Sequence, residues 1–432
     1  MFVANGLNGF PVLNFGLQSG EGNTKTLTVP DADNLDGGPG ISIFLVLKRN
    51  EMLADFAAII QKRDITGGDA TKQAWDLEMD AGSNPNKFQF VVARDLFLKN
   101  SQIINTDKYY IVNVNYQGAL QTASFINDGD IESTNFYNRP IQATNATLIL
   151  GGFQPMNVAE AILVNSDMNM AQIKLVTNYL AAKYDLTLKA GDVISDFPYK
   201  NDLIGIGKDR NITNTADDVH LFSSGGGIEL KAATIADAGD YVFAGHNGNA
   251  ITENTTTKQW SRTYYLKNIG DVTNITLGFD FEKAGLTTVP DNTYKLLYKS
   301  TESGSWTDLS LTPVYDAGRK VLTYTLSTFQ DGYYTISKLM STGIRNFSKS
   351  TELSVYPNPA TDKLVVNIKS QYKGKLVYNI VDLQGRIIVN ANLEKGSEAI
   401  SEFINLDMLA PGTYMLEVIQ DSEKEVKMFL KN

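Results

Sequence analysis

The chain has 432 residues, of which 43% are hydrophobic and 20% are charged, so it can fold into roughly two to four domains and is not disordered as a whole. A net charge of -10 without any Lys/Arg cluster excludes nucleic acid as a partner and disfavours anionic membrane surfaces. The lack of cysteine removes disulfides and thiolate chemistry, and no apolar run reaches the ~20 residues of a membrane-spanning helix.

The first part of the chain has the pattern of a β domain. Alternating apolar runs rich in Val, Ile, Phe and Tyr occur at residues 41–47, 87–92 and 109–114, and Gly, Asn, Asp and Pro separate them. Such runs predict the strands of an antiparallel sandwich. We place this domain at residues 1–190.

One helix interrupts the strand pattern, from about Met170 to Lys183. Its apolar residues recur at steps of three and four, which lines one face of a helix. They are Ile173, Val176, Leu180 and Tyr184. The residues that we expect to face water are Gln172, Lys174, Asn178 and Lys183. The helix is therefore predicted to pack on the outside of the sandwich.

The order of these elements resembles a concanavalin/laminin-G-like jelly roll. The segments that carry the resemblance are a hairpin at 9–15 and 26–30, a strand pair at 109–118 and 125–129, and runs at 149–153 and 159–164 before the helix. The resemblance implies a lectin-like module that binds a glycan or another surface polymer, with exposed aromatic rings against sugar faces. The aromatic candidates are Trp75, Tyr116, Phe136 and Tyr137, and the sequence does not say which is exposed.

Three carboxylates in this domain alternate along one run. Asp76, Glu78 and Asp80 would project from one face of a strand, with Trp75, Leu77 and Met79 on the other. Glycoside hydrolysis needs paired carboxylates. The spacing departs from the Glu-x-Asp-x-x-Glu strand of some jelly-roll glycosidases, so we interpret the run as a solvated acidic face over a buried apolar one. No catalytic residue is predicted, and a polysaccharide hydrolase or lyase is the alternative.

Two acidic loops could supply oxygen ligands for calcium. One holds Asp31, Asp33 and Asp36 before two glycines, and the other holds Asp128 and Asp130. Leucine 35 stands where a helix-loop-helix calcium site needs an oxygen ligand, so the pattern favours plain Asp/Gly turns. We predict no metal site and no cofactor, and calcium is the alternative.

Residues 191–338 again show regular strand signals, among them 241–243, 263–266, 275–279 and 294–298, and they predict a second β-sandwich. The runs at 203–209, 245–247 and 260–264 resemble an uncharacterised β domain that often lies between lectin-like and sorting domains in surface proteins, and the resemblance implies no activity.

Only two histidines occur, His220 and His246. No Gly-x-Ser-x-Gly nucleophile motif accompanies them, so we interpret His246, between glycines, as a structural hydrogen-bonding group rather than a general base. His220 is expected in or near a strand.

The C-terminal segment, 353–432, follows a polar linker predicted at 339–352. It opens with Tyr356, Pro357, Asn358 and Pro359, and these prolines suit an extended edge entry because they cannot donate hydrogen bonds. A hairpin turn is predicted at Asp382, Gly385 and Arg386. The later motif residues are Gly412, Thr413, Tyr414, Lys427, Phe429 and Lys431.

These motifs, in this order, resemble the type A C-terminal sorting domain of the type IX secretion system of Bacteroidota. The resemblance covers the whole segment and implies a small Ig-like β-sandwich that carries the protein through an outer-membrane translocon. The implied partners are that translocon and its shuttle proteins, and the implied location is extracellular or the outer-membrane surface. An ordinary Ig-like module is the alternative.

We therefore expect a mainly β chain: an N-terminal jelly-roll sandwich with one C-terminal helix, a middle β-sandwich and a small C-terminal sandwich. The leading hypothesis is a non-enzymatic, exported protein that binds a glycan or a surface polymer, as an adhesin would. The alternatives are a polysaccharide-degrading enzyme and a purely structural surface component or translocon cargo.

Overall fold

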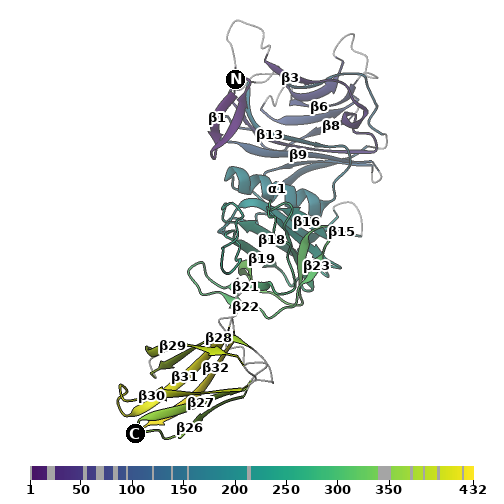
Figure 1. The fold of residues 1–432 in the computed structure, drawn as a ribbon. Coiled ribbons are helices and arrows are strands. Elements are labelled where there is room, and N and C mark those ends of the chain that lie inside the picture. Colours follow the sequence, from purple (N-terminus) through teal and green to yellow (C-terminus); the bar gives the residue numbers. More distant parts are fainter. Residues whose placement is uncertain are drawn as a thin grey trace. The chain divides into compact units, whose positions relative to one another are not determined.

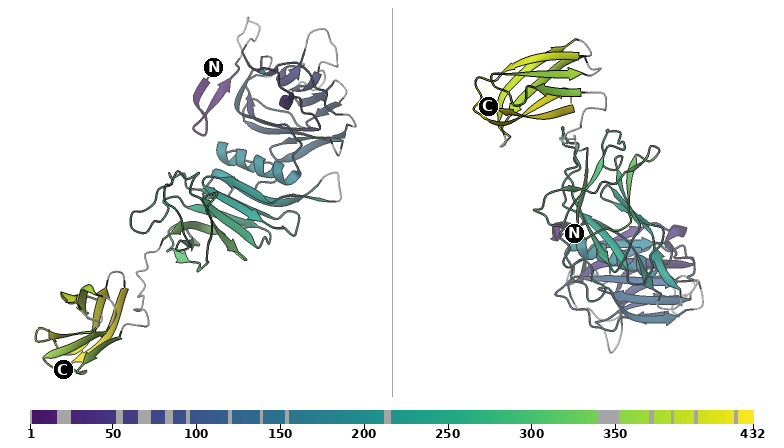
Figure 2. Two further views of the ribbon diagram at one scale, coloured as in Figure 1. Left: turned by 45° about the vertical axis from the view of Figure 1, so that its right-hand side comes forward. Right: turned by 90° about the horizontal axis from the view of Figure 1, so that it is seen from below.

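The computed structural model forms two compact units, Met1–Lys338 and Leu339–Asn432 (Figures 1 and 2). It describes residues 2–16, 25–51, 56–64, 73–80, 86–93, 96–118, 121–137, 140–152, 155–211, 216–338, 352–369, 373–382, 385–396, 399–420 and 423–432. All but the last residue of the predicted linker at 339–352 lie outside these ranges. The predicted boundary between residues 190 and 191 falls inside the first unit and stays a prediction.

The first sandwich consists of two antiparallel sheets, I and II. Sheet I has seven strands, in the order β1 (Phe2–Leu7), β2 (Phe10–Asn14), β13 (Met156–Val164), β4 (Gly40–Arg49), β9 (Tyr110–Gln117), β10 (Thr122–Asn127) and β11 (Asp130–Phe136). Sheet II has six, in the order β3 (Thr26–Val29), β12 (Leu148–Gly151), β5 (Ala58–Arg63), β6 (Gln73–Met79), β7 (Phe88–Val92) and β8 (Leu96–Lys99). A short 3-10 helix, η1 (Asp33–Leu35), precedes β4. The jelly-roll prediction is confirmed.

The core of this sandwich follows from the two-residue period of its strands. On β6, Trp75, Leu77 and Met79 point into a buried apolar cluster, together with Phe90 of β7 and Val114 of β9. The alternate residues of β6 therefore point out of the sandwich on the far side of sheet II.

The single helix, α1 (Met170–Tyr184), begins at a capping box in which Asn169 accepts from the backbone N–H of Gln172 (2.9 Å) and the Gln172 side chain accepts from that of Asn169 (3.0 Å). Ile173 and Leu180 belong to one buried cluster with Phe44 of sheet I. Leu203, Tyr241 and Phe243 of the next sandwich belong to the same cluster, so α1 is covered on two sides (Figure 2).

The packing of the second sandwich against α1 corrects one expectation about this helix. Asn178 was expected to face water, but it is fully buried. A one-sided amphipathic pattern does not anticipate a helix that two sandwiches share. The other three residues expected on the water side are partly exposed.

The second sandwich also has two antiparallel sheets, III and IV. Sheet III has the order β15 (Asp217–His220), β14 (Asn201–Arg210), β18 (Tyr241–His246), β19 (Tyr264–Ile269), β25 (Gly332–Ser337), β21 (Lys295–Lys299) and β22 (Thr307–Asp308). Sheet IV has the order β16 (Phe222–Gly225), β17 (Ile228–Ala232), β20 (Ile275–Asp280), β24 (Val321–Leu326) and β23 (Val314–Asp316). Aromatic rings dominate the core, where Trp260 contacts Phe279 and Phe281 edge to face.

The C-terminal unit is a small sandwich with its own apolar core. One sheet has the order β26 (Glu352–Tyr356), β27 (Lys363–Lys369) and β30 (Ala399–Asn405). The other has the order β29 (Ile387–Lys395), β28 (Gly374–Val381), β31 (Gly412–Gln420) and β32 (Glu423–Lys431). Within the ranges described, no helix is long and apolar enough to cross a membrane.

Candidate functional sites

The first and last motifs of the C-terminal unit meet in space. The Asn358 side chain accepts from the backbone N–H of Leu430 (2.9 Å) and donates to the carbonyl of Met428 (3.3 Å). Ala360 extends this contact, because its N–H donates to the Leu430 carbonyl (2.7 Å). Pro357 and Pro359 flank Asn358 and have no N–H to leave unpaired at this edge. The entry segment is therefore fastened to the final strand.

The predicted turn in the second motif is present. Gly385 takes a positive φ of 79° and donates its N–H to the Asp382 carbonyl (3.0 Å). The Asp382 carboxylate accepts from both the backbone N–H (2.9 Å) and the Nε (2.7 Å) of Arg386. These three residues therefore act together in the turn between β28 and β29.

The third and fourth motifs pair along β31 and β32. Tyr414 lies opposite Phe429 with stacked rings 5.9 Å apart, and its hydroxyl donates to the Ala410 carbonyl (3.0 Å). Gly412 lies opposite Lys431. Thr413 and Lys427 take their places in the same ladder, opposite Leu430 and Leu416.

Strand β32 is the edge of its sheet, and apolar side chains line its outer side. Met428 is 60% exposed and Leu430 is 40% exposed. The entry segment pairs with backbone groups of this edge, so what β32 offers to another protein is the contact area of its exposed apolar side chains.

A second candidate site lies on the outward side of sheet II, and we call it the polar face. Its residues come from β5, β6, β7 and β8, and they are Gln61, Arg63, Asp76, Glu78, Gln89 and Lys99. Arg63 lies 2.6 Å from a carboxylate oxygen of Asp76 and 3.4 Å from one of Glu78. Gln89 donates to the other Glu78 oxygen (2.5 Å).

The interpretation of the three carboxylates as a solvated acidic face is wrong. Asp76, Glu78 and Asp80 do project opposite the apolar core face of β6, but each is at most 3% exposed. They are satisfied by cations instead of water, and Asp80 pairs with Lys99 (2.8 Å). Sequence reasoning missed Arg63 as the shared partner, although it ends a strand whose last three residues are all polar.

An aromatic ring is exposed beside the polar face. Phe97 of β8 lies opposite Val91, whose other neighbour is Asp76, and Phe97 is 46% exposed. It was not among the aromatic candidates. Of those, Trp75, Tyr116 and Tyr137 are buried, and Phe136 alone is exposed, on the edge strand of sheet I.

The first acidic loop holds a buried ammonium group. The Lys62 side chain is fully buried and its Nζ lies 2.6 Å from Asp31 and 3.0 Å from Asp36. Backbone carbonyls of Thr144 (3.0 Å) and Ala146 (2.7 Å) complete its partners. Asp33 begins η1 and is exposed. The oxygens that the alternative assigned to calcium therefore surround a lysine.

The second acidic loop forms the turn between β10 and β11. Asp128 accepts from the N–H of Ile111 (2.9 Å) and from Lys108 (3.0 Å), and burial nevertheless raises the pKa of its carboxyl. Asp130 pairs with Lys189. No cluster of three or more metal-binding side chains occurs within the described ranges.

The two histidines end different strands of sheet III, β15 and β18. Gly248 donates its N–H to His246 Nδ1 (2.9 Å), so His246 Nε2 carries the proton toward Asp202 (2.9 Å). Burial lowers the pKa of His246, with a smaller contribution from Arg262, and the bond to Asp202 opposes this shift. His220 ends β15, and burial lowers its pKa too.

The fold and the first site define a multidomain β protein with a C-terminal export module. Residues 354–432 match the family described as the Secretion system C-terminal sorting domain. The protein is therefore cargo of the type IX secretion system, exported to the extracellular space or the cell surface.

No curated protein matches the chain. The chain is similar to a native heptameric SAP-like pentraxin from Limulus polyphemus, at 11% identity, covering 39% of this chain and 81% of that one, with a TM-score of 0.29. It is also similar to domain 4 of AbnA, an extracellular arabinanase from Geobacillus stearothermophilus in complex with arabinotriose, at 9% identity, 38% and 86% coverage and a TM-score of 0.27. A third similar structure is dimeric latent PorU from Porphyromonas gingivalis, at 11% identity, 90% and 29% coverage and a TM-score of 0.17.

Proposed function

We propose that this exported protein binds a glycan or another surface polymer on the polar face of its jelly roll, as an adhesin does. One observation carries the proposal: charged and amide side chains occupy four adjacent strands on a side of the sheet that the core does not need. Phe97, exposed at the edge of this face, supplies a surface on which a sugar ring can stack.

The ion pairs of the polar face are better explained by ligand recognition than by a contribution to the stability of the fold. Buried ion pairs are a weak source of stability, because the desolvation cost of the charges offsets their attraction. Gln61 is buried and its side-chain Nε2 has no hydrogen-bond partner among the described residues, so the hydrogen bonding within the polar face is incomplete.

The same contacts favour binding over hydrolysis. A glycosidase keeps one carboxylic acid protonated, usually in an apolar setting, and places the second across the scissile bond. Here Asp76 and Glu78 contact one guanidinium, that of Arg63. We therefore propose that the protein is not an enzyme.

We also propose which surface the secretion machinery recognises. The exposed apolar side chains of Met428 and Leu430 on the outer side of β32 support this strand as the contact for the translocon and its shuttle proteins.

The test of polymer binding is a glycan array probed with the full chain, with and without a calcium chelator. We expect a retained polysaccharide, and we expect Phe97→Ala to weaken its binding by about fivefold to tenfold because a stacking surface is lost. The chelator should change nothing, because Lys62 occupies the oxygens of the acidic loop.

Phe136→Ala is the matched control, because it removes another exposed phenylalanine ring, from sheet I. Binding that survives Phe97→Ala but is lost in Phe136→Ala would move the site to the other sheet. An array without any retained polysaccharide contradicts the proposal, and release of shorter saccharides from a retained one would favour the enzyme instead.

A further inference from the structure

A cavity of about 280 Å³ lies where α1 meets both sandwiches of the first unit. Its apolar wall and its polar groups come from separate elements. They are Ile126 of β10, Ile131 of β11, Met170, Ile173 and Thr177 of α1, and Arg210 of β14. Because both sandwiches and the shared helix contribute, only the assembled unit forms this site.

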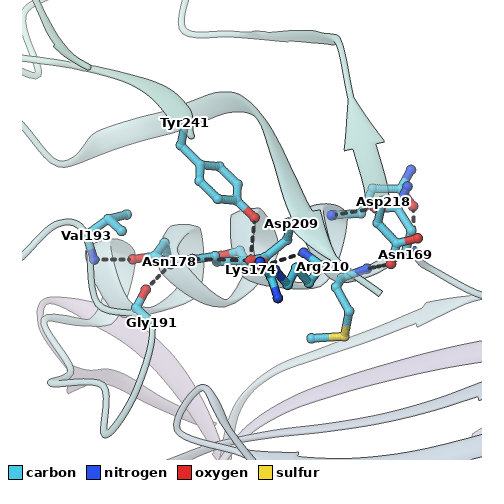
Figure 3. A network of polar contacts seen from close by, with 11 residues as sticks. Asn169, Lys174, Asn178, Gly191, Val193, Asp209, Arg210, Asp218 and Tyr241 are labelled. Atoms are coloured by element: carbon cyan, nitrogen blue, oxygen red, sulfur yellow. Dashed lines mark hydrogen bonds and ion pairs between the residues drawn. The ribbon is translucent and has the colours of Figure 1, made fainter. Parts of the chain in front are cut away.

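The charges around the cavity are partly balanced already (Figure 3). Asp209 accepts from the Tyr241 hydroxyl (2.8 Å) and from the backbone N–H of Arg210 (2.8 Å), and it pairs with Lys174 (3.2 Å). This leaves the Arg210 guanidinium, for which the described part of the chain supplies no ion pair. Of the three charged residues that line the cavity, Lys174, Asp209 and Arg210, two are cations.

A buried hydroxyl inside the cavity also lacks a partner. Thr177 is 2% exposed and lines the cavity, yet its Oγ1 makes no hydrogen bond among the described residues. A helical threonine usually bonds the carbonyl of the preceding turn. An unpaired hydroxyl in an apolar wall costs free energy, and a ligand oxygen would relieve that cost.

We propose that this cavity binds a small organic monoanion, with an apolar body of about six carbons and one carboxylate. The body lies against Ile126, Ile131 and Ile173, and the carboxylate pairs with Arg210. Thr177 donates its hydroxyl to an oxygen of the ligand. The inference is independent of the polymer site, which lies on sheet II.

The overall negative charge of the protein would make anion binding selective for this cavity. A chain with a net charge of -10 repels anions in general, so an anion binds only where local groups attract it. A cavity with apolar walls also suits a carbon chain better than a sugar. The volume is small, which limits the ligand to a few carbons beyond its carboxylate.

The experiment titrates the full chain with hexanoate, 1-hexanol and hexylammonium, followed by calorimetry or ligand-observed NMR. We expect saturable hexanoate binding with a Kd on the order of 1 mM, weaker binding of hexanol and none of hexylammonium. Arg210→Gln should weaken hexanoate about tenfold and leave hexanol unchanged. Thr177→Val, which keeps the shape of the side chain, should weaken hexanoate about threefold.

Lys189→Gln is the matched control, because it removes a nearby cation that pairs with Asp130 and does not line the cavity. It should bind hexanoate as the wild type does. The proposal is overturned if hexanoate binds no better than hexanol, or if both cavity variants, shown to be folded by tryptophan fluorescence, bind hexanoate like the wild type.

Discussion

At the scale of single residues, His246 shows how burial sets a pH dependence. Its ring meets that of Tyr264 edge to face, its Nε2 lies 2.9 Å from Asp202, and burial favours the neutral form. The pKa of His220, the second histidine, is lowered by burial as well, and a hydrogen bond with the Phe222 backbone opposes this shift. Both lie in the second sandwich, so their effects on its stability add.

We predict that the first unit loses stability as the pH falls from about 7.5 to about 5.5. The folded pKa of each histidine is below its unfolded value of 6.5, so both states are neutral above that value and the unfolded state takes up protons first below it. Denaturation followed by tryptophan fluorescence measures this unit alone, because Trp75, Trp260 and Trp306 all lie in it. His246→Gln should reduce the loss, and an equal or higher midpoint at the lower pH contradicts the prediction.

The residue scale is also where the sequence was least informative. The alternation of Asp76 and Glu78 with Trp75 and Leu77 correctly predicted two faces of one strand, because side-chain direction follows from the backbone period. It could not show that Arg63 neutralises the carboxylates. That partner comes from another strand, and its position depends on strand pairing, which local pattern does not encode.

At the scale of elements, α1 holds the first unit together by polar as well as apolar contacts. Asn178 donates to the carbonyls of Lys174 (2.9 Å) and Gly191 (3.0 Å), and its side-chain oxygen accepts from the N–H of Val193 (3.1 Å). At the other end, Asp218 of β15 accepts from the N–H of Met170 (2.8 Å). The helix therefore positions the chain that leads into the second sandwich.

We predict that Asn178→Ala destabilises the first unit by about 2 kcal/mol, because it removes the hydrogen bonds of Asn178 to the Gly191 carbonyl and the Val193 N–H and leaves the space of a fully buried side chain empty. Urea unfolding followed by tryptophan fluorescence measures the change. Asn135→Ala, at an exposed position whose side chain accepts from the N–H of its neighbour Phe136, is the control and should stay within about 0.5 kcal/mol of wild type. Equal midpoints for the two variants would contradict a structural role for Asn178.

The sequence predicted which helices and strands form more reliably than it predicted what packs against them. The predicted helix at 170–183 matches α1 closely, because its apolar period is long and Asn169 caps its start. Its burial on two sides was not predictable. The residues of β14 and β18 that cover it read as ordinary strand positions, and nothing local marks a strand face that will meet a helix.

At the scale of the whole molecule, the protein consists of a large unit and a separate export unit. Leu339–Asn432 has its own core, and the sorting motifs assemble within it: Asn358 bonds β32, and Asp382 bonds Arg386 in a turn. This part of the sequence was the most predictable, because its motifs carry a family resemblance as well as a local pattern. The ligand was not predictable, since no motif specifies it.

We predict that residues 339–432, fused to a periplasmic reporter in a cell with a type IX system, carry the reporter to the medium or the cell surface. The unit has its own core, so it should fold without the rest of the chain. Asn358→Ala should lower the exported fraction, because it releases the entry segment from the edge strand β32.

Ser401→Ala, exposed on the opposite sheet, is the control and should export normally. A wild-type fusion that remains in the periplasm would contradict an export role for this unit. Full export of a folded Asn358→Ala fusion would show that export does not depend on the hydrogen bonds between Asn358 and β32.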